Sequence, residues 1–518
     1  MKNQNTTFTA ILLTLGFLAL SPIAQAVSPP PDGGYPGFNT AEGDNALKNL
    51  TTGQGNTALG WFSLGLVTDG SFNTGVGVGA LVLNTGGSNT GIGAVALILN
   101  TTGQRNTAVG SAAMVNNSTG NDNTAVGDHA LTSQTGEGPN TAVGSGALFN
   151  NTTGFQNTAN GTFALFSNTA GNFNTATGDR ALLNNTEGGS NTANGVGALH
   201  DNSTGDNNTA IGVSALIANT IGSANTATGV DALAFNTTGE SNTANGFQAL
   251  FSNTEGTFNT ASGDQALFSN TTGSKNTAVG FQALFNNLNQ DNNTAVGFGA
   301  LFNQTFGNGN TAIGRAALGQ NISGTNNTAL GNLAGDNVTT ADNVICIGSN
   351  VAGEDVDNTC FIGNIFGVTS AGATAVVVNK AGKLGTIVSS RRFKDDIKPM
   401  DQASEALFAL RPVSFHYKKE IDPEGVPQFG LVAEDVEAVN PDLVVRDAEG
   451  KVNTVRYDAV NAMLLNEFLK EHRKVEEQQN QIDALTAQLK QQAALIEKVN
   501  DELQLNRSTR QVVVTNEQ

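Results

Sequence analysis

The sequence predicts a mainly β protein, in which a parallel β-roll or solenoid of short repeats precedes a small α+β domain and a coiled-coil helix. Three observations lead to this fold class. A 17-residue motif recurs through most of the 518-residue chain, 62 residues are glycine while only 6% are aromatic and 13% charged, and aliphatic residues recur in heptads near the C-terminus. Small residues at fixed turns are typical of stacked repeats rather than of a packed enzyme or a charged, disordered tail. The net charge of −19 disfavours binding to nucleic acid or to anionic lipid.

Residues 1–26 have the pattern of a secretory signal peptide. Lys2 gives a positive start, an apolar run covers residues 8–20, and Ala-Gln-Ala at 24–26 is an acceptable cleavage site. The run is shorter than the roughly 20 apolar residues that a membrane-spanning helix needs. We therefore expect a secreted or cell-surface protein without an integral membrane anchor, whose mature chain begins with a proline-rich linker over residues 27–38.

The repeat region is expected to cover residues 39–363. The pattern N-T-x-x-G begins first at Asn39 and last at Asn327, 18 times in all, and every step is 17 residues except one of 16. A complete unit, such as residues 140–156, reads N-T-A-V-G-S-G-A-L-F-N-N-T-T-G-F-Q. Its apolar segments T-A-V-G and A-L-F, separated by Gly and Asn corners, predict two short strands and two tight turns per unit. Stacking these units would align the recurring asparagines in a side-chain ladder.

The interior of such a roll is expected to be thin. One unit supplies a few alanines, a leucine and often a phenylalanine, namely Phe149, Phe166, Phe251, Phe268, Phe285 and Phe302. Packing several chains side by side would bury more apolar surface, so a homotrimer is expected, although the repeat alone does not fix the number of chains.

The repeats resemble the heads of trimeric autotransporter adhesins (YadA-like heads), which share the pattern N-x-T-A-x-G-x-x-A. This resemblance covers about residues 39–363 and implies a left-handed β-roll trimer and an adhesin-like role. The 17-residue period is longer than in those heads. The chain also lacks their C-terminal membrane anchor, so attachment to a surface by that route is not expected.

No metal site is expected in the repeats or beside the two cysteines. The calcium-binding pattern G-G-x-G-x-D does not recur, and Cys346 and Cys360 have no histidine nearby to complete a zinc site. In an exported protein the two cysteines either form a disulfide or remain two buried small side chains, and the sequence leaves both alternatives open. Residues 364–388 are expected to form a β connector, with an apolar strand over 375–378 and a turn over 379–382.

From Ser389 onward charged residues become frequent and the repeats end. Residues 384–397 read L-G-T-I-V-S-S-R-R-F-K-D-D-I. This segment resembles the start of the peptidase S74 family, the intramolecular chaperones of phage endosialidase tailspikes, whose motif is S-D-x-R-x-K-x-x-I with cleavage immediately before the serine. Ser389, Arg392, Lys394 and Ile397 match the motif, and Ser390 stands where the family has Asp.

Two later segments extend the resemblance to about residue 495. Residues 429–434, F-G-L-V-A-E, are similar to the family's G-h-I-A-Q segment with Glu434 in place of Gln, and Tyr457 with the apolar run after it is similar to the closing segment. The resemblance implies an intramolecular chaperone domain, with its α+β core over residues 389–462, that drives trimer assembly.

The resemblance also implies a single-turnover self-cleavage between Val388 and Ser389, in which Ser389 is the nucleophile and Lys394 the base. A serine hydroxyl attacks only when a neighbouring base accepts its proton, and lysine is a base only when its amine is neutral, which burial or nearby positive charge favours. Arg391 and Arg392 would supply that charge. No cofactor is expected.

Two alternatives remain for these residues. Without the resemblance, Ser389 and Lys394 are ordinary surface residues of a linker, and a domain that assembles the trimer without cutting is also consistent with the sequence. His416 lies on a separate predicted strand, and we expect a structural role for it rather than a third catalytic position.

Apolar spacing predicts the remaining elements. An amphipathic helix is expected over residues 401–410, strands over 413–418, 428–433 and 443–446, and a short helix over 435–439. A coiled-coil helix is expected over residues 463–506, followed by a tail over 507–518. Its seam consists of Ile482, Leu485, Leu489, Ile496, Val499 and Leu503, with Gln478 and Gln492 at polar core positions.

Together these features predict an exported trimeric fibre, adhesin-like or tail-fibre-like, assembled and cut by its C-terminal domain. A matrix or surface-binding rod that is never cleaved is the alternative, with an unidentified surface or glycan ligand. A polysaccharide-degrading tailspike is less favoured, because the repeats place few acids at fixed positions and glycosidases need an organised carboxylate pair.

Overall fold

The computed structural model describes residues 35–136, 138–366, 368, 370, 374–379, 382–447 and 449–514, with side chains up to residue 507. The chain divides into two compact units, Met1–Val368 and Thr369–Gln518. The expected signal peptide and most of the expected linker lie outside the described residues.

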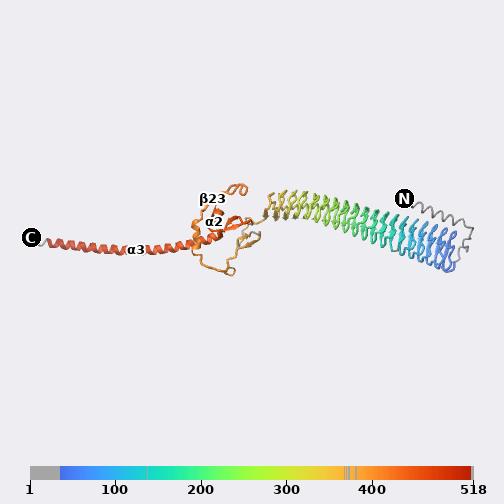
Figure 1. Cartoon of the computed structure of the whole chain (residues 1–518), viewed down its shortest axis with the longest axis horizontal. Helices are drawn as coiled ribbons and strands as arrows, with labels where there is room; N and C mark the ends of the chain where they lie inside the picture. Colours follow the sequence, from blue (N-terminus) through green and yellow to red (C-terminus); the bar gives the residue numbers. More distant parts are fainter. Residues whose placement is uncertain are drawn as a thin grey trace. The chain divides into compact units, whose positions relative to one another are not determined.

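The first unit is a parallel β-solenoid whose turns stack one upon the next (Figure 1). A single 20-stranded sheet runs along it, with one three-residue strand per turn. Its strands are β1 (Thr40–Glu42), β2 (Thr57–Leu59), β3 (Thr74–Val76), β4 (Thr90–Ile92), β5 (Thr107–Val109), β6 (Thr124–Val126), β7 (Thr141–Val143), β8 (Thr158–Asn160), β9 (Thr175–Thr177), β10 (Thr192–Asn194), β11 (Thr209–Ile211), β12 (Thr226–Thr228), β13 (Thr243–Asn245), β14 (Thr260–Ser262), β15 (Thr277–Val279), β16 (Thr294–Val296), β17 (Thr311–Ile313), β18 (Thr328–Leu330), β19 (Ile345–Ile347) and β20 (Cys360–Ile362). The parallel solenoid predicted from the repeat is confirmed.

Each turn contains one strand, so the prediction of two strands per turn is wrong. The A-L-x segment forms a turn in which the leucine has a positive φ, for example 52° at Leu148 and 53° at Leu250. Such a conformation costs a non-glycine residue roughly 1–3 kcal/mol. Burial of the leucine, worth roughly 1.5–3 kcal/mol, offsets that cost. Hydrogen bonds to the next turn add to this, since the backbone N–H of Leu148 donates to Ala164 O at 3.0 Å.

The core of the solenoid consists of alanine, leucine and asparagine. The middle alanine of each central strand and the following Ala-Leu pair, such as Ala142, Ala147 and Leu148, are fully buried. Space along the sheet is tight. A Cβ on Gly263, whose φ is 139°, would lie 2.5 Å from the carbonyl oxygen of Gly280 in the next turn, so this corner needs glycine.

Two ladders of buried asparagines run through this core, where one was predicted. In the first, the backbone N–H of Asn157 donates to Oδ1 of Asn140 at 3.0 Å. In the second, Nδ2 of Asn168 donates to Oδ1 of Asn151 at 2.7 Å and to Gly171 O at 3.0 Å. A buried amide without partners would be costly, and the identical turn above and below supplies them.

The phenylalanines expected in the interior lie outside the alanine-leucine core. Phe149, Phe166, Phe251, Phe268, Phe285 and Phe302 are only half-buried, and their rings stack on one another between turns. The small residues already fill the inside of the turn, so a phenylalanine one position after the buried leucine is directed outward. The core is fully packed without these phenylalanines.

The last two turns, β19 and β20, carry the cysteines, and both thiols are free. Cys346 pairs in register with Phe361 and Cys360 with Ile345. Neighbouring residues on a strand alternate between the two faces of the sheet, so the two side chains point in opposite directions. Cys346 is buried and Cys360 is exposed. The disulfide alternative is therefore not realised, and only one cysteine is a buried small side chain.

The second unit is small and mixed. It contains the hairpin β21 (Val376–Val378) and β22 (Leu384–Thr386), the 3-10 turns η1 (Arg391–Phe393), η2 (Asp401–Ala409) and η3 (Pro441–Leu443), the strand pairs β23 (Val413–Phe415) with β24 (Gln428–Gly430) and β25 (Val444–Arg446) with β26 (Val452–Val455), and the helices α2 (Ala433–Val439) and α3 (Tyr457–Val514). A helix or strand is present at each position where one was expected, with η2 in the 3-10 form. Helix α3 begins six residues before the expected coiled-coil helix and continues to Val514, through most of the segment expected as a tail.

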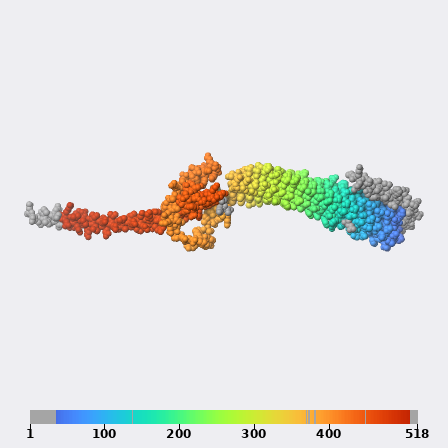
Figure 2. Space-filling view, viewed as in Figure 1, coloured from blue at the N-terminus to red at the C-terminus, as the bar shows by residue number. Residues whose placement is uncertain are grey.

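The core of the second unit is limited. Its buried apolar side chains are Val436, Leu443, Val444, Val455 and Met463. The C-terminal part of α3 extends away from this core (Figure 2), and its side chains from residue 471 to 507 are exposed. No helix among the described residues is long and apolar enough to cross a membrane.

Candidate active site

One 3-10 turn shapes the segment around the predicted cleavage point. The backbone N–H of Phe393 donates to Ser390 O at 3.0 Å, and that of Lys394 donates to Arg391 O at 3.1 Å. This turn, η1, folds the chain back on itself. As a result Nζ of Lys394 donates a hydrogen bond to Oγ of Ser389 at 3.1 Å. The structure thus brings the two predicted catalytic side chains together.

The contact between Ser389 and Lys394 lies at the surface of the chain. Val388, Ser389 and Lys394 are all exposed. The guanidinium carbon of Arg392 lies 4.6 Å from the ring centroid of Phe393, in a cation–π arrangement. Arg391 is also exposed. A single chain therefore holds the pair in contact but leaves it in water.

His416 directly follows β23 and is exposed. Within the described residues it makes no hydrogen bond to Ser389 or to Lys394.

A polar cluster that the sequence did not reveal joins η2 to α3. The buried Oγ of Ser404 donates to Oε1 of Glu467 at 2.5 Å and accepts from Nδ2 of Asn466 at 2.7 Å. Lys470 donates to the same carboxylate at 2.7 Å. Lys470 and then Ser404 hold the pKa of Glu467 below its usual value. The sequence signal is weak, because Ser404 lies 63 residues from Glu467.

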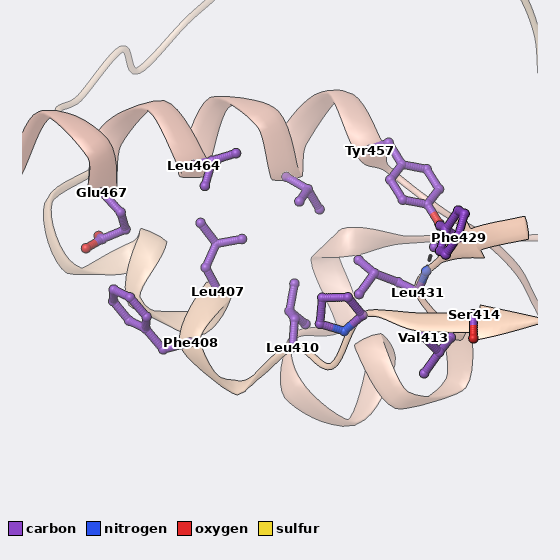
Figure 3. A pocket seen from close by; sticks show the side chains of 13 residues that line it. Leu407, Phe408, Leu410, Val413, Ser414, Phe429, Leu431, Tyr457, Leu464 and Glu467 are labelled. Carbon is purple, nitrogen blue, oxygen red and sulfur yellow. Dashed lines mark hydrogen bonds between the residues drawn. The ribbon is translucent and has the colours of Figure 1, made fainter.

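An apolar pocket of about 740 Å³ opens between η2, the β23–β24 pair and the start of α3. Figure 3 shows Leu407 on η2 directed towards Leu464 on α3, with Tyr457 beside Phe429. The hydroxyl of Tyr457 accepts a hydrogen bond from the backbone N–H of Leu431 at 3.1 Å, which ties the start of α3 to the end of β24. At the rim, the side chains of Phe408 and Phe429 are 73% and 85% exposed. An uncovered apolar surface of this kind marks an interaction site.

Comparison with known families adds one finding. Residues 389–445 match the family model of peptidase S74, described as the chaperone of endosialidase. This segment is a peptidase S74 domain. The match begins at Ser389, includes Lys394, and contains the pocket-forming strands β23 and β24. No curated protein matches the chain.

A long parallel β-solenoid followed by an S74 domain fits a protein of the tailspike or fibre type. Within the described residues, no group of three or more His, Cys, Asp or Glu side chains is arranged to hold a metal ion.

Proposed function

We propose that this protein is an exported trimeric fibre whose S74 domain assembles three copies of the chain and then cuts each chain between Val388 and Ser389. One observation supports the cut above all. Lys394 Nζ lies 3.1 Å from Ser389 Oγ, and Ser389 is the first residue of the S74 match. A base within hydrogen-bonding reach of a serine is the geometric requirement for a nucleophilic dyad.

The proposed reaction proceeds in two steps. Oγ of Ser389 attacks the carbonyl carbon of Val388, Lys394 accepts the hydroxyl proton and passes it to the departing nitrogen of Ser389, and the peptide bond is exchanged for an ester. Water then hydrolyses the ester, which leaves a carboxylate on Val388 and restores the hydroxyl of Ser389, now the N-terminal residue. Because nucleophile and target are adjacent in one chain, no substrate needs to be bound.

Assembly of several chains would supply the dry environment that the site lacks in a single chain. A lysine amine accepts a proton only in its neutral form, and burial favours that form. Packing of further copies against residues 388–394 would remove water from the site and favour the neutral amine. We therefore propose that the cut follows assembly.

The surfaces for assembly lie on α3 and around the pocket. Ile482, Leu489 and Ile496 recur every seven residues and are all more than half exposed. A solitary helix gains little from such residues, whereas a helical bundle buries them. Leu464, in the pocket wall, and Phe468 continue the same heptad register towards the start of α3.

The export route and the surface role belong to the same proposal. They are supported by the signal-peptide pattern at residues 1–26 and by the likeness of the repeats to adhesin heads. A rod that assembles without being cut is the second candidate, favoured by Ser390 in place of the family's Asp.

The test is to express the chain from residue 27 to 518 and to follow it by denaturing gel and intact mass. The parent should yield fragments 27–388 and 389–518, and a Ser389→Ala variant should remain whole. Ser390→Ala is the matched control, since it removes the neighbouring hydroxyl and should still be cut. If the parent stays whole while sedimentation shows a trimer, the non-cleaving rod is correct; a monomeric parent contradicts the assembly proposal.

A further inference from the structure

Between Phe235 and Phe302 the solenoid carries nine phenylalanines outside its core, and eight of them, all except Phe258, lie in two rows along the turns. In the first row, Phe251, Phe268, Phe285 and Phe302 stack with ring centroids 5.1–5.3 Å apart, and Phe235 meets Phe251 edge-on. In the second row, Phe281 stacks on Phe298 at 5.1 Å, and Phe247 occupies the same position of an earlier turn. We call these eight side chains the phenylalanine patch.

The patch is too exposed to be explained as core. The side chains of Phe235, Phe247, Phe281 and Phe298 are 40–55% exposed. A buried phenylalanine covers roughly 150–250 Å², so these four rings leave on the order of 400 Å² of apolar surface in water. That is as large as the largest apolar patch on a typical monomer, and such patches are often functional.

A row of glutamines lies beside Phe251, Phe268 and Phe285, whereas the exposed Asp264 takes the second-row position in the turn between Phe247 and Phe281. Gln248, Gln265 and Gln282 form a ladder, in which Nε2 of Gln282 donates to Oε1 of Gln265 at 2.8 Å and Nε2 of Gln265 donates to Oε1 of Gln248 at 3.3 Å. Each ladder amide is thereby partly satisfied within the chain. A partner that covers the glutamine strip strands no charge, whereas one that also covers the second row must leave Asp264 in contact with water.

We propose that the phenylalanine patch is the contact between neighbouring copies of the solenoid in the assembled fibre. The inference rests on the proposed self-association of the chain. Copies joined through their S74 domains and α3 helices run parallel from the same starting point, so the same turn of each copy stands at the same height. A row with one ring per turn then meets an identical row of the neighbouring copy in register. A partner without the same repeat spacing could not match every ring in this way.

The size of the patch explains why the contact needs the C-terminal unit. Stable complexes bury about 800 Å² on each partner, and the patch offers about half of that. A weak contact forms when the partners are tethered, because the tether raises the effective concentration to the millimolar range. The stacked rings of the first row cover one another's faces, so the row presents ring edges to a partner. Ring edges favour contact with the interdigitating rings of a neighbouring copy over contact with a flat sugar face.

The contact is tested with the full mature chain carrying Ser389→Ala, which keeps the two units joined, and Cys360→Ser, which removes the exposed native thiol. A reporter cysteine is placed at Ser269, next to Phe268, and in the matched control at Ser241, an exposed corner residue of the turn. Oxidation or a short bis-maleimide should link chains through position 269 and not through position 241. Adding Phe281→Asn and Phe298→Asn should abolish that link while the sedimentation mass stays unchanged.

The outcomes separate the two proposals. A monomeric mass overturns the proposed self-association together with the contact. An oligomeric mass without a link at 269, or with equal links at 269 and 241, overturns the patch contact and leaves the self-association intact. A reporter at 269 that stays freely reactive in the oligomer likewise overturns it and directs attention to an external ligand. Circular dichroism of the double asparagine variant verifies that the solenoid is folded.

Discussion

Lys394 donates a hydrogen bond to the hydroxyl of Ser389 at 3.1 Å across a single 3-10 turn, and the peptide bond before Ser389 is the proposed scissile bond. The turn is short and local, so it forms without help from the rest of the fold. What the single chain does not provide is a dry environment. The contact between the two side chains thus lies within six residues, and in the proposed mechanism cleavage depends on assembly.

The role of Lys394 as a base predicts that arginine cannot replace it. Lys394→Arg keeps the charge and a donor near Ser389, but a guanidinium does not deprotonate in proteins. We expect cleavage of Lys394→Arg to be as slow as that of Lys394→Ala, at least 100-fold below the parent, in line with the typical contribution of a general base. Time courses on denaturing gels measure both variants. An arginine variant that cuts like the parent would show that the contact is only structural.

The buried asparagine ladder predicts a local loss of stability. Asn168→Ala removes the donor to Asn151 Oδ1 and to Gly171 O, and the acceptor of Asn185 Nδ2. Leaving such groups buried and unpaired should cost about 1–3 kcal/mol. Asn160→Ala, at an exposed strand position, is the control and should change the free energy of unfolding by less than about 0.5 kcal/mol. Urea unfolding and hydrogen exchange of the neighbouring turns check this, and equal effects of the two variants would contradict the ladder's role.

The glycine that follows the strand predicts a second and larger loss of stability when it is replaced. An alanine Cβ at Gly263 would clash with the backbone of Gly280 at 2.5–2.6 Å, whereas at Gly299, which also has a positive φ, nothing lies within 4 Å. Gly299→Ala should therefore cost only about 1–2 kcal/mol for its left-handed conformation. Gly263→Ala should cost clearly more, because the backbone of the next turn must shift. Thermal melts of the two variants compare them, and similar melting temperatures would disprove the close approach.

The period of the repeat was enough to predict the stacking, because identical turns can share buried amides and backbone bonds only in register. The backbone of the A-L-x segment was not predictable, since leucine has no intrinsic preference for positive φ and adopts it here through hydrogen bonds to adjacent turns. The outward position of Phe268 was not predictable either, because it follows from the same backbone conformation of the A-L-x segment. Cys346 and Cys360 lie one residue out of register, an offset that only the shortened last turn reveals.

The candidate site was predictable in part. The resemblance to the S74 motif pointed to Ser389 and Lys394, and one turn of 3-10 helix suffices to bring a residue five positions later back to the first. The link from Ser404 to Glu467 was not predictable, because it depends on how η2 docks on α3, and neither residue stands in a recognisable motif.

The hydrogen bonds at the C-terminal end of the solenoid predict that the stability of its last turns depends on pH. The carboxylate of Asp355 accepts hydrogen bonds from the backbone N–H groups of Thr339, Thr340 and Ala341, all at 2.8 Å, and from both threonine hydroxyls. Although the loss of hydration opposes it, these donors hold the pKa of Asp355 far below its usual range. A carboxyl whose pKa is lower in the folded than in the unfolded chain stabilises the fold above its unfolded value of about 3.9, and this stabilisation is lost as the pH falls towards the folded value.

Asp355→Asn should therefore loosen the last turns at neutral pH and leave them insensitive to acid, while the parent loosens only below about pH 4. The amide keeps one acceptor oxygen and cannot serve five donors. Hydrogen exchange at Thr339, Thr340 and Ala341 measures the effect directly. Glu354→Gln, a neutralisation at the adjacent exposed position, is the control and should leave the exchange rates unchanged. Protection in Asp355→Asn equal to that of the parent at pH 7 would show that backbone packing, and not the carboxylate, closes this end of the solenoid.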